Sequence, residues 1–326
     1  MIVSKTPLRI SFFGGGSDIP QFYSRKPGRV LSTSINRHIM IALNRCETDH
    51  VRVVYSELEK VLTADRVKHD RVRHALQMFD ITSNIEIASF SDVPTKGTGL
   101  GSSSTFTVGL LKGLMELREQ RLYNKTDLAE LACHLEINLC EDPIGKQDQY
   151  AAAFGGFNLI EFDSSGVEVT PVNIGAADLH NLRLNLVCLS TGIVRSTATV
   201  LADQVKGLKS DKSQTFNNTA ILADMTELAF IHLQKRSYDD FGAMLNEAWF
   251  LKKKLAKTIS NPAIDEMYDK GLKAGALGGK LLGAGGGGYM LFYVPGKTRA
   301  QFAEKMREYK EFKFDFSDEG SRSWMI

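Results

Sequence analysis

The chain contains the stretch Pro94-Thr95-Lys96-Gly97-Thr98-Gly99-Leu100-Gly101-Ser102-Ser103-Ser104, which decides its fold. Its alternating glycines lack the Cβ atom that would hold a ligand away from the backbone. Apolar residues then recur with helical spacing, which predicts a helix from Phe106 to about Gln120 with Ser102 to Ser104 at its N-cap. A glycine-rich turn before a helix N-terminus offers N–H donors and a positive dipole end to an anion. The stretch therefore predicts a phosphate-binding loop. The alternative, a flexible Gly/Ser linker, does not usually run straight into an amphipathic helix.

The two commonest phosphate-binding patterns do not explain this stretch. A Walker loop requires Gly-x-x-x-x-Gly-Lys-Ser/Thr, which the sequence lacks. The pattern Gly-x-Gly-x-x-Gly occurs at Gly283, Gly285 and Gly288, but the following segment, 289–294, is predicted to be a strand. A dinucleotide fingerprint needs a helix there, so a Rossmann site is excluded.

The composition is that of an ordinary globular protein. The chain has 326 residues, enough for two domains, with 43% hydrophobic residues, 24% charged residues and a net charge of +2. A nucleic-acid-binding protein would carry a larger and more clustered charge. The first 20 residues lack the apolar core of a signal peptide, and no run approaches a membrane span. We therefore expect a cytoplasmic protein that binds neither nucleic acid nor membrane; its oligomeric state is not predicted.

The cysteines form no C-x-x-C pair, which indicates reduced thiols; they are Cys46, Cys133, Cys140 and Cys188. A metal cluster of Cys133, His134, Cys140 and Glu141 is conceivable. The two cysteines lie seven positions apart on a predicted helix and so share a face, which favours a place in the core.

Hydrophobic periodicity predicts both strands and helices along the chain. Strands are expected at 2–13, 30–43, 51–55, 85–88, 182–189, 289–294 and 312–316. Helices are expected at 65–78, 126–139, 238–255 and 298–309, the second capped by Thr126 with Glu130 nearby. Because the pattern restarts near residue 176, we expect an N-terminal domain of residues 1–175 and a C-terminal domain of residues 176–326.

Two further segments combine polar residues with small ones. The strand at 2–13 runs into Gly14-Gly15-Gly16-Ser17-Asp18, which predicts either the rim of a site or a simple hairpin turn. Asp148 lies in the polar segment 145–150 and precedes a run rich in alanine and glycine. Small residues permit close backbone approach, so we expect this polar segment inside a cleft.

Three glycine-rich segments, taken in order, resemble the motifs of the GHMP kinase family, which includes galactokinases, homoserine kinases, mevalonate kinases and phosphomevalonate kinases. The segments are 7–18 (PLRISFFGGGSD), 94–104 (PTKGTGLGSSS) and 280–289 (KLLGAGGGGY). Each alone is a weak signal, whereas the set is highly specific. The resemblance implies an α+β fold with an N-terminal domain like domain 2 of ribosomal protein S5, a ferredoxin-like C-terminal domain and a site between them.

The resemblance also implies roles for individual residues. The phosphates of ATP are expected to bind Lys96, Gly97, Gly99, Leu100, Gly101, Ser102, Ser103 and Ser104. Mg2+ is expected to bind Ser103 and Glu136, although Glu136 alone could be a solvent-facing helix acid. Asp148 is expected to accept the proton of the sugar hydroxyl, and Arg9 to keep that aspartate ionised and neutralise the transferring phosphoryl group. Phosphoryl transfer relies on such positioning and electrostatic stabilisation.

One departure from the family pattern concerns the substrate. The galactokinase string Gly-Glu-His-Thr-Asp is here Gly14 to Asp18, which removes two large polar side chains and argues against galactose. Asp18, with Gly16 and Ser17, is expected to bind the sugar. This string and the segment 145–150 are most similar, within the family, to the D-glycero-D-manno-heptose 7-phosphate kinases. The implied activity is phosphorylation of the anomeric hydroxyl to give the 1,7-bisphosphate, for nucleotide-activated heptose and surface polysaccharide.

Other functions stay open. The chain could phosphorylate another sugar, fucose- or galactose-like, at the anomeric position. It could also be a catalytically silent sugar sensor, but such a protein is expected to lose its base or its metal-binding acid, and Asp148 and Glu136 are both present.

A phosphate at the far end of the sugar would need a basic residue to bind it. Arg195 is the first candidate and Lys146 or Arg29 the next, because a cation can pair with phosphate oxygens and an arginine can bind two at once. Each could instead be a surface charge. Gly285 and Gly286 are expected to bring the backbone against the substrate or the other domain.

Overall fold

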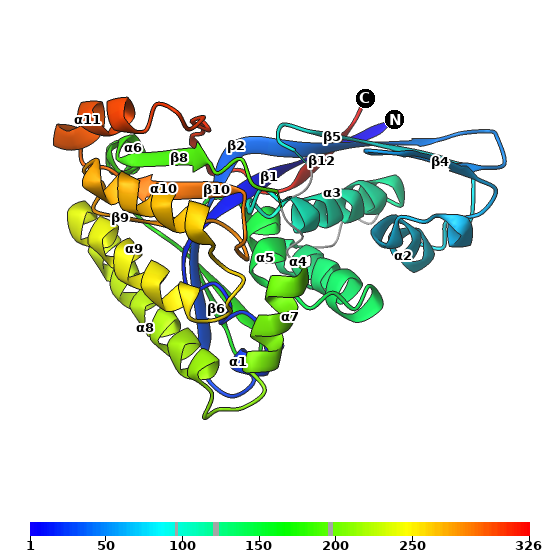
Figure 1. Cartoon of the computed structure of the whole chain (residues 1–326). Coiled ribbons are helices and arrows are strands. Elements are labelled where there is room, and N and C mark those ends of the chain that lie inside the picture. Colours follow the sequence, from blue (N-terminus) through cyan, green and yellow to red (C-terminus); the bar gives the residue numbers. More distant parts are fainter. Residues whose placement is uncertain (95–96, 120–123, 195–197) are drawn as a thin grey trace.

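The computed structural model describes residues 1–94, 97–119, 124–194 and 198–326. Within them, the strands of the larger sheet are β1 Ile2–Phe13, β2 Gly28–Arg45, β3 Val51–Val54, β4 Leu58–Val61, β5 Ile85–Ser91, β6 Phe157–Phe162, β7 Val167–Pro171, β11 Phe316–Ser317 and β12 Arg322–Met325. Six of these follow the order β12-β1-β2-β5-β3-β4 (Figure 1). β6 and β11 also pair with β2, and β7 pairs with β6.

The first half of the chain also forms helices. They are α1 Pro20–Tyr23, α2 Asp70–Met78, α3 Ser102–Leu117, α4 Lys125–Cys133 and α5 Gln147–Phe154. α3 can approach β1 and β2 closely because two of its glycines face them. A Cβ atom at Gly109 would lie 2.8 Å from Thr6 Oγ1, and one at Gly113 would lie 2.2 Å from a methyl carbon of Leu43. This packing fixes the start of α3, and with it the glycine-rich stretch, beside β1.

The smaller sheet is antiparallel and has the order β8-β10-β9. Its strands are β8 Leu186–Ser190, β9 Gly278–Leu281 and β10 Tyr289–Tyr293. The helices of this half are α6 Ala176–Leu184, α7 Ala198–Gly207, α8 Gln214–Gln234, α9 Tyr238–Lys253, α10 Pro262–Lys273 and α11 Arg299–Lys305. The predicted α+β class is confirmed, as is the strand after the last glycine motif. No helix in the described part of the chain has both the length and the apolar character needed to cross a membrane.

The end of β1 joins the two halves of the molecule. The rings of Phe12 and Phe13 lie 5.5 and 5.2 Å from that of Phe241 on α9. Lys280 of β9 donates a hydrogen bond to the carbonyl oxygen of Phe12 at 2.7 Å. At its other end β1 pairs with β12, with Ile2 opposite Met325, so the two chain termini lie side by side (Figure 1). The domain boundary near residue 175 stays a prediction; β11 and β12, which follow it, pair within the larger sheet.

Two predicted strands differ from the structure. The strand expected at 182–189 was wrong in its first part, because α6 continues to Leu184 and β8 begins at Leu186. Leucines at every second position from Leu182 fit a strand. Leu179 and Leu182, three positions apart, also fit one face of a helix, and the structure follows the helical pattern there. The segment 312–316 alternates in burial as expected, yet only Phe316 belongs to a strand. Its phenylalanine rings pack on one another, at centroid distances of 6.3 and 6.2 Å, without a full ladder of strand pairing.

Two helix starts also differ. The helix expected from residue 65 is a 3-10 turn at Ala64–Arg66 followed by α2, which begins at Asp70. α4 is capped by Asn124 and not by Thr126: Asn124 accepts from the N–H of Asp127 at 2.9 Å, and the Asp127 carboxylate accepts from the N–H of Asn124 at 3.2 Å. This reciprocal capping box satisfies two backbone donors at once, which the Thr126 alternative would not. α4 then continues as a π-helical turn, His134–Leu139.

Candidate active site

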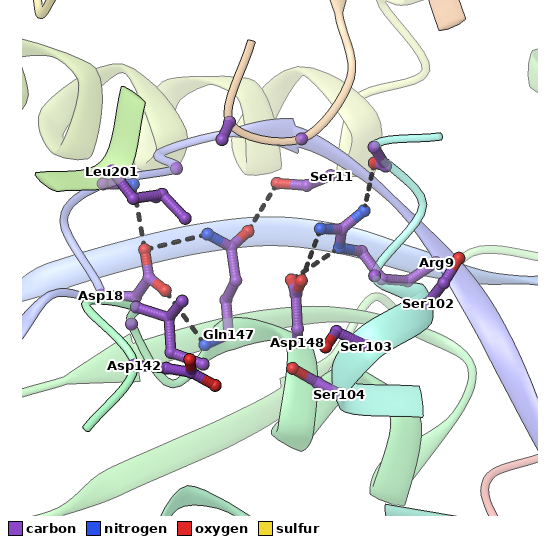
Figure 2. A pocket seen from close by; sticks show the side chains of 18 of the residues that line it. Arg9, Ser11, Asp18, Ser102, Ser103, Ser104, Asp142, Gln147, Asp148 and Leu201 are labelled. Atoms are coloured by element: carbon purple, nitrogen blue, oxygen red, sulfur yellow. Dashed lines mark hydrogen bonds and ion pairs between the residues drawn. The ribbon is translucent and has the colours of Figure 1, made fainter. Parts of the chain in front are cut away.

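A cavity of about 600 Å³ lies where the end of β1, the glycine-rich stretch and the β9–β10 loop meet (Figure 2). Its wall contains most of the predicted site residues: Arg9, Gly16, Asp18, Gly97, Gly99, Gly101, Ser102, Ser103, Ser104 and Asp148. The fold therefore gathers parts of all three predicted motifs and the polar segment around Asp148 into one cavity.

The glycine-rich stretch enters α3 through left-handed backbone. The φ angles of Gly97, Gly99 and Gly101 are 72°, 74° and 77°, a region that residues with a Cβ atom rarely adopt. Gly101 itself is the N-cap, and no side chain caps the helix, so the predicted capping by the serines was wrong. The left-handed turn ends at Gly101, and Ser102 already belongs to the first helical turn. The first N–H groups of a helix have no partner within it, and here that turn borders the cavity.

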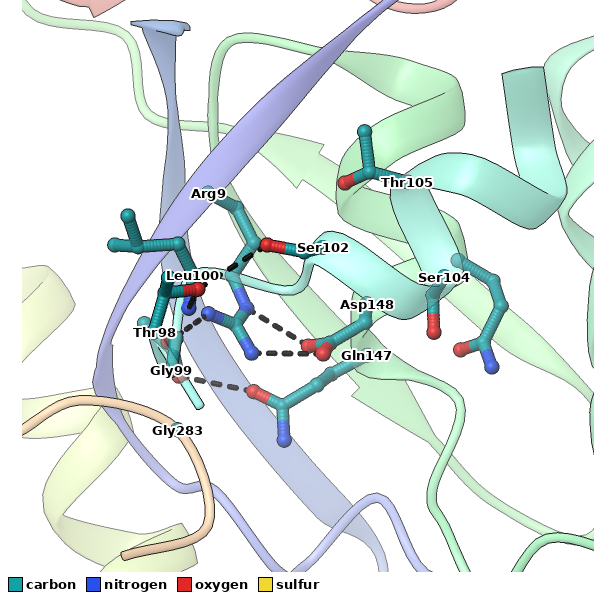
Figure 3. A network of polar contacts seen from close by, with 12 residues as sticks. Arg9, Thr98, Gly99, Leu100, Ser102, Ser104, Thr105, Gln147, Asp148 and Gly283 are labelled. Atoms are coloured by element: carbon teal, nitrogen blue, oxygen red, sulfur yellow. Dashed lines mark hydrogen bonds and ion pairs between the residues drawn. The ribbon is translucent and has the colours of Figure 1, made fainter. Parts of the chain in front are cut away.

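Arg9 connects this stretch to Asp148. Its Nε and Nη2 atoms donate to the two carboxylate oxygens of Asp148, each at 2.7 Å, in a bidentate ion pair. Its Nη1 atom donates to the carbonyl oxygen of Gly99 at 2.6 Å, and its backbone N–H donates to that of Leu100 at 3.1 Å (Figure 3). Leu100 is buried and contributes this carbonyl from outside the cavity wall. The guanidinium therefore fixes the distance between the loop and the carboxylate.

Asp18 and Gln147 form a second polar group in the cavity (Figure 2). Asp18 Oδ1 accepts from the N–H of Gly16 and from Gln147 Nε2, both at 2.9 Å, and Oδ2 accepts from the N–H of Gln147 at 3.1 Å. Burial raises the pKa of Asp18, and the backbone hydrogen bonds offset part of this rise. Gln147 Oε1 accepts in turn from the hydroxyl of Ser11 at 2.9 Å. Both side chains are thereby held in one orientation.

Glu136 does not suit direct metal binding as it is arranged here. Its Oε1 atom accepts from Arg71 Nε and Thr107 Oγ1, both at 2.9 Å. Its Oε2 atom accepts from Ser104 Oγ at 2.7 Å and Gln149 Nε2 at 2.6 Å. A carboxylate has about four acceptor positions, so none is left for a cation. Ser103, by contrast, is an exposed residue in the cavity wall and suits an oxygen ligand.

Several predicted site residues lie away from the cavity wall. The Ser17 hydroxyl donates within its own turn, to the carbonyl oxygen of Gly14 at 2.7 Å. Lys146 is bonded to both carboxylate oxygens of Glu130 at 2.9 Å. Gly285 and Gly286 pack behind the wall against Ile259, whose carbonyl oxygen accepts from the N–H of Gly286 at 2.9 Å. Lys96 and Arg195 lie outside the described residues.

Ser11, Gln147 and Lys252 are among the polar residues of the wall that the predicted site did not include. Ser11 and Gln147 lie in quoted motif segments, so only their orientation was hidden. Lys252 gave no signal, because it is one of three consecutive lysines on an amphipathic helix. Its Nζ atom donates to the carbonyl oxygens of Leu281 at 2.8 Å and Gly283 at 2.5 Å. Burial, and then the charge of Arg9, lower the pKa of Lys252 to about 7.

Chemically, the cavity combines an anion site with a carboxylate. The helix N-terminus and glycine-rich stretch offer N–H donors, and Arg9 adds a fixed positive charge. Asp148 lies beside that charge and is partly exposed, at 24% of its side chain, so it can reach a bound hydroxyl. Such an arrangement can bind a phosphate chain and accept a proton next to it.

Comparison with known proteins gives two family-model matches and several relatives. Residues 65–156 match the model "GHMP kinases N terminal domain", and residues 229–311 match "GHMP kinases C terminal". The D-glycero-alpha-D-manno-heptose 7-phosphate kinase of Campylobacter jejuni is 30% identical over 340 residues, covering 100% of this chain and 99% of the relative. The bifunctional fucokinase/GDP-fucose pyrophosphorylase of Arabidopsis thaliana is 26% identical over 94% of this chain, which spans 31% of that protein.

A solved structure has the same fold over the whole chain. It is the crystal structure of a D-glycero-D-manno-heptose 1-phosphate kinase from Bacteroides thetaiotaomicron, with a TM-score of 0.81 and 24% identity. The match covers 100% of this chain and 99% of that one.

Proposed function

We propose that this chain, which belongs to the GHMP kinase family and is a sugar kinase, phosphorylates the anomeric hydroxyl of D-glycero-D-manno-heptose 7-phosphate with ATP. The observation that carries the proposal is the bidentate pair of Arg9 and Asp148, in the same cavity as the glycine-rich stretch. The relative with 30% identity over the full chain, whose name states a heptose 7-phosphate, supports the choice of acceptor. The product is the 1,7-bisphosphate, a precursor of nucleotide-activated heptose for surface polysaccharide.

The reaction needs a bound phosphate chain and a proton acceptor. The anomeric oxygen attacks the terminal phosphorus of ATP, the bond from phosphorus to the bridging oxygen breaks, and ADP leaves. The hydroxyl proton passes to the carboxylate of Asp148. Arg9 orients that carboxylate and offsets negative charge on the phosphoryl group, while the N–H groups at the start of α3 bind phosphate oxygens.

At the other end of the cavity, Asp18 and Gln147 are proposed to bind the sugar. Asp18 Oδ2 accepts a single hydrogen bond within the protein, which leaves it an acceptor position for a sugar hydroxyl. Gly15 and Gly16 have no side chains there, so a larger sugar can enter. Arg195, which the structure does not describe, stays the first candidate for the far phosphate.

Magnesium is proposed as the counter-ion of ATP, with Ser103 as its protein ligand. We assign Glu136 no direct contact with the metal, because its oxygens are already occupied by four donors.

The test is ADP release measured against a panel of acceptors: heptose 7-phosphate, heptose 1-phosphate, free heptose, fucose and galactose. We expect heptose 7-phosphate to give by far the highest kcat/KM. Phosphorus NMR of the product should then contain a new phosphate coupled to the anomeric proton beside the original 7-phosphate. Equal kcat/KM for free and phosphorylated heptose would overturn the proposed acceptor.

The second candidate is an anomeric kinase for a fucose-like sugar. The fucokinase relative favours this alternative. So does the fact that two residues predicted to bind the far phosphate of the sugar are already paired with acidic side chains. Lys146 is bonded to Glu130, and Arg29 Nε is bonded to Glu161 at 2.8 Å. A preference for fucose in the same panel would support this alternative.

A further inference from the structure

Lys252 is a buried cation in the wall of the cavity. Only 8% of the residue is exposed, although lysine is rarely buried without a charged partner. Two of its three N–H donors are used by the carbonyl oxygens of Leu281 and Gly283. Among the described residues, Lys252 forms no ion pair with a carboxylate, and the charge of Arg9, after burial, lowers its pKa. Its positive charge is therefore uncompensated inside the protein.

The surroundings of Lys252 carry an excess of positive charge. Arg9 of β1 lies on one side and Lys280 of β9, itself buried, on another. Arg9 is itself paired with Asp148 of α5 through both carboxylate oxygens, whereas neither lysine forms an ion pair among the described residues. Burial and the neighbouring cations lower the pKa values of both lysines, as expected where like charges are brought together away from water. An anion in the cavity would remove this excess.

Lys252 lies on the side of the cavity that holds the glycine-rich stretch. Its acceptor Gly283 belongs to the loop that packs on Gly99: a Cβ atom on Gly99 would lie 2.4 Å from the carbonyl oxygen of Leu282 and 3.1 Å from the N atom of Gly283. The carbonyl oxygen of Gly99 in turn accepts from Arg9. The ammonium group is thus associated with the predicted phosphate loop and not with Asp18 at the sugar end.

We propose that Lys252 is a further binding residue of this site and that its ammonium group contacts the terminal phosphate of the nucleotide. The inference rests on the proposed function in taking that nucleotide to be ATP. Leu281 and Gly283 hold the ammonium in place, and its third N–H donor is directed to a phosphate oxygen. Because the anion favours the charged form of the lysine, the enzyme takes up a proton as the nucleotide binds.

Calorimetry with nucleotide alone tests the contact, using the non-hydrolysable analogue AMP-PNP, ADP and a fixed magnesium concentration. Lys252→Gln and Lys252→Met should weaken AMP-PNP binding by about 10-fold to 100-fold, the usual worth of a hydrogen bond to a charged group. ADP, which lacks the terminal phosphate, should bind almost as in the wild type. The matched control is Lys254→Gln, which removes the exposed lysine directly after the last residue of α9 and should leave both affinities unchanged.

Proton uptake gives a second readout that needs no variant to fold. At pH 8 a lysine with a pKa of about 7 is mostly neutral, so the wild type should take up most of one proton on binding AMP-PNP. The uptake appears as a binding enthalpy that changes with the ionisation enthalpy of the buffer, and it should be lost in both Lys252 variants. AMP-PNP binding that is equal in wild type and variants, or wild-type binding without proton uptake, would overturn the assignment.

The design separates this inference from the proposed function. If the acceptor sugar were wrong, the nucleotide titrations would be unaffected, because they contain no sugar. If the chain did not bind ATP at all, the wild type itself would give no binding signal. An equal loss of AMP-PNP and ADP affinity in the Lys252 variants would assign the lysine to the inner phosphates and overturn the contact with the terminal one.

Discussion

Replacing Asp148 by asparagine removes the proposed proton acceptor while keeping the shape of the side chain. The carboxylate receives two hydrogen bonds from Arg9, each 2.7 Å long. An asparagine keeps one acceptor oxygen and turns an NH2 group towards a guanidinium N–H, so one of the two bonds is lost and two donors face each other. The variant therefore changes both the chemistry and the anchoring of Arg9.

The two effects differ in size. Loss of a positioned base lowers kcat by about 10²-fold to 10⁴-fold. Loss of a hydrogen bond between charged groups costs about 1.5–3 kcal/mol of folding free energy, and the low end applies here because 24% of the Asp148 side chain is exposed to water. We therefore expect a fall of a few degrees in melting temperature beside a far larger loss of turnover.

The assay is ADP release with the best acceptor of the panel, together with thermal melting and calorimetric ATP binding. Glu130→Gln is the matched control: this carboxylate also accepts two hydrogen bonds from a cation, Lys146, but lies outside the cavity wall. The control should melt at a lower temperature and keep its kcat. If Asp148→Asn kept a kcat close to that of the wild type, or if the control lost as much activity, Asp148 would have to leave the mechanism.

Three further predictions follow from the close contacts of the site. Gly99→Ala should raise KM for ATP, because a residue with a Cβ atom pays about 1–2 kcal/mol for left-handed backbone such as the φ of 74° at this position. The added Cβ atom would also lie 2.4 Å from the carbonyl oxygen of Leu282. An unchanged KM for ATP would contradict this prediction. Glu136→Gln should lower the free energy of unfolding by about 3 kcal/mol in a denaturant titration, because Arg71 loses a buried partner. A magnesium titration of the same variant should keep its midpoint; a shifted midpoint would restore Glu136 as a ligand. As pH rises from 7 towards 10.5, the free energy of unfolding of the wild type should increase relative to that of Lys252→Met, by at most about 1.4 kcal/mol per pH unit. The reason is that in this pH range the lysine is protonated in the unfolded chain and mostly neutral in the folded one. Parallel curves of unfolding free energy against pH would count against the lowered pKa.

The parts of the site that the sequence predicted are those whose reasons are local. Gly97, Gly99 and Gly101 adopt left-handed backbone, which glycine accepts without strain, so their alternation in the sequence already indicates the loop. The strand after the last glycine motif was equally readable, because the aromatic and branched residues from Tyr289 follow the glycines directly. The first pattern therefore indicated a phosphate loop, and the second excluded a dinucleotide fold.

The parts that the sequence could not predict depend on contacts between distant elements. Helical spacing identifies the face of Glu136 but not its donors, which come from α2, α3 and α5. The exact start of α3 decides that Ser104 contacts Glu136 while Ser103 borders the cavity. Lys252 is buried and bonded to carbonyl oxygens, whereas its neighbour Lys253 is half-buried and paired with Asp265, a difference that no pattern of three adjacent lysines reveals.

The position of Asp148 also depends on the end of the chain. Asp148 lies in the first turn of α5, and the other end of this short helix is held by the segment just before β12. The N–H of Ser321 donates to the carbonyl oxygen of Ala152 at 3.0 Å, and a Cβ atom on Gly320 would lie 2.3 Å from that of Ala153. β12 is in turn anchored by its pairing with β1, the strand that carries Arg9. Both members of the arginine–aspartate pair are therefore supported by the same C-terminal segment, so a change there would alter the geometry of the proposed proton acceptor without touching any glycine motif.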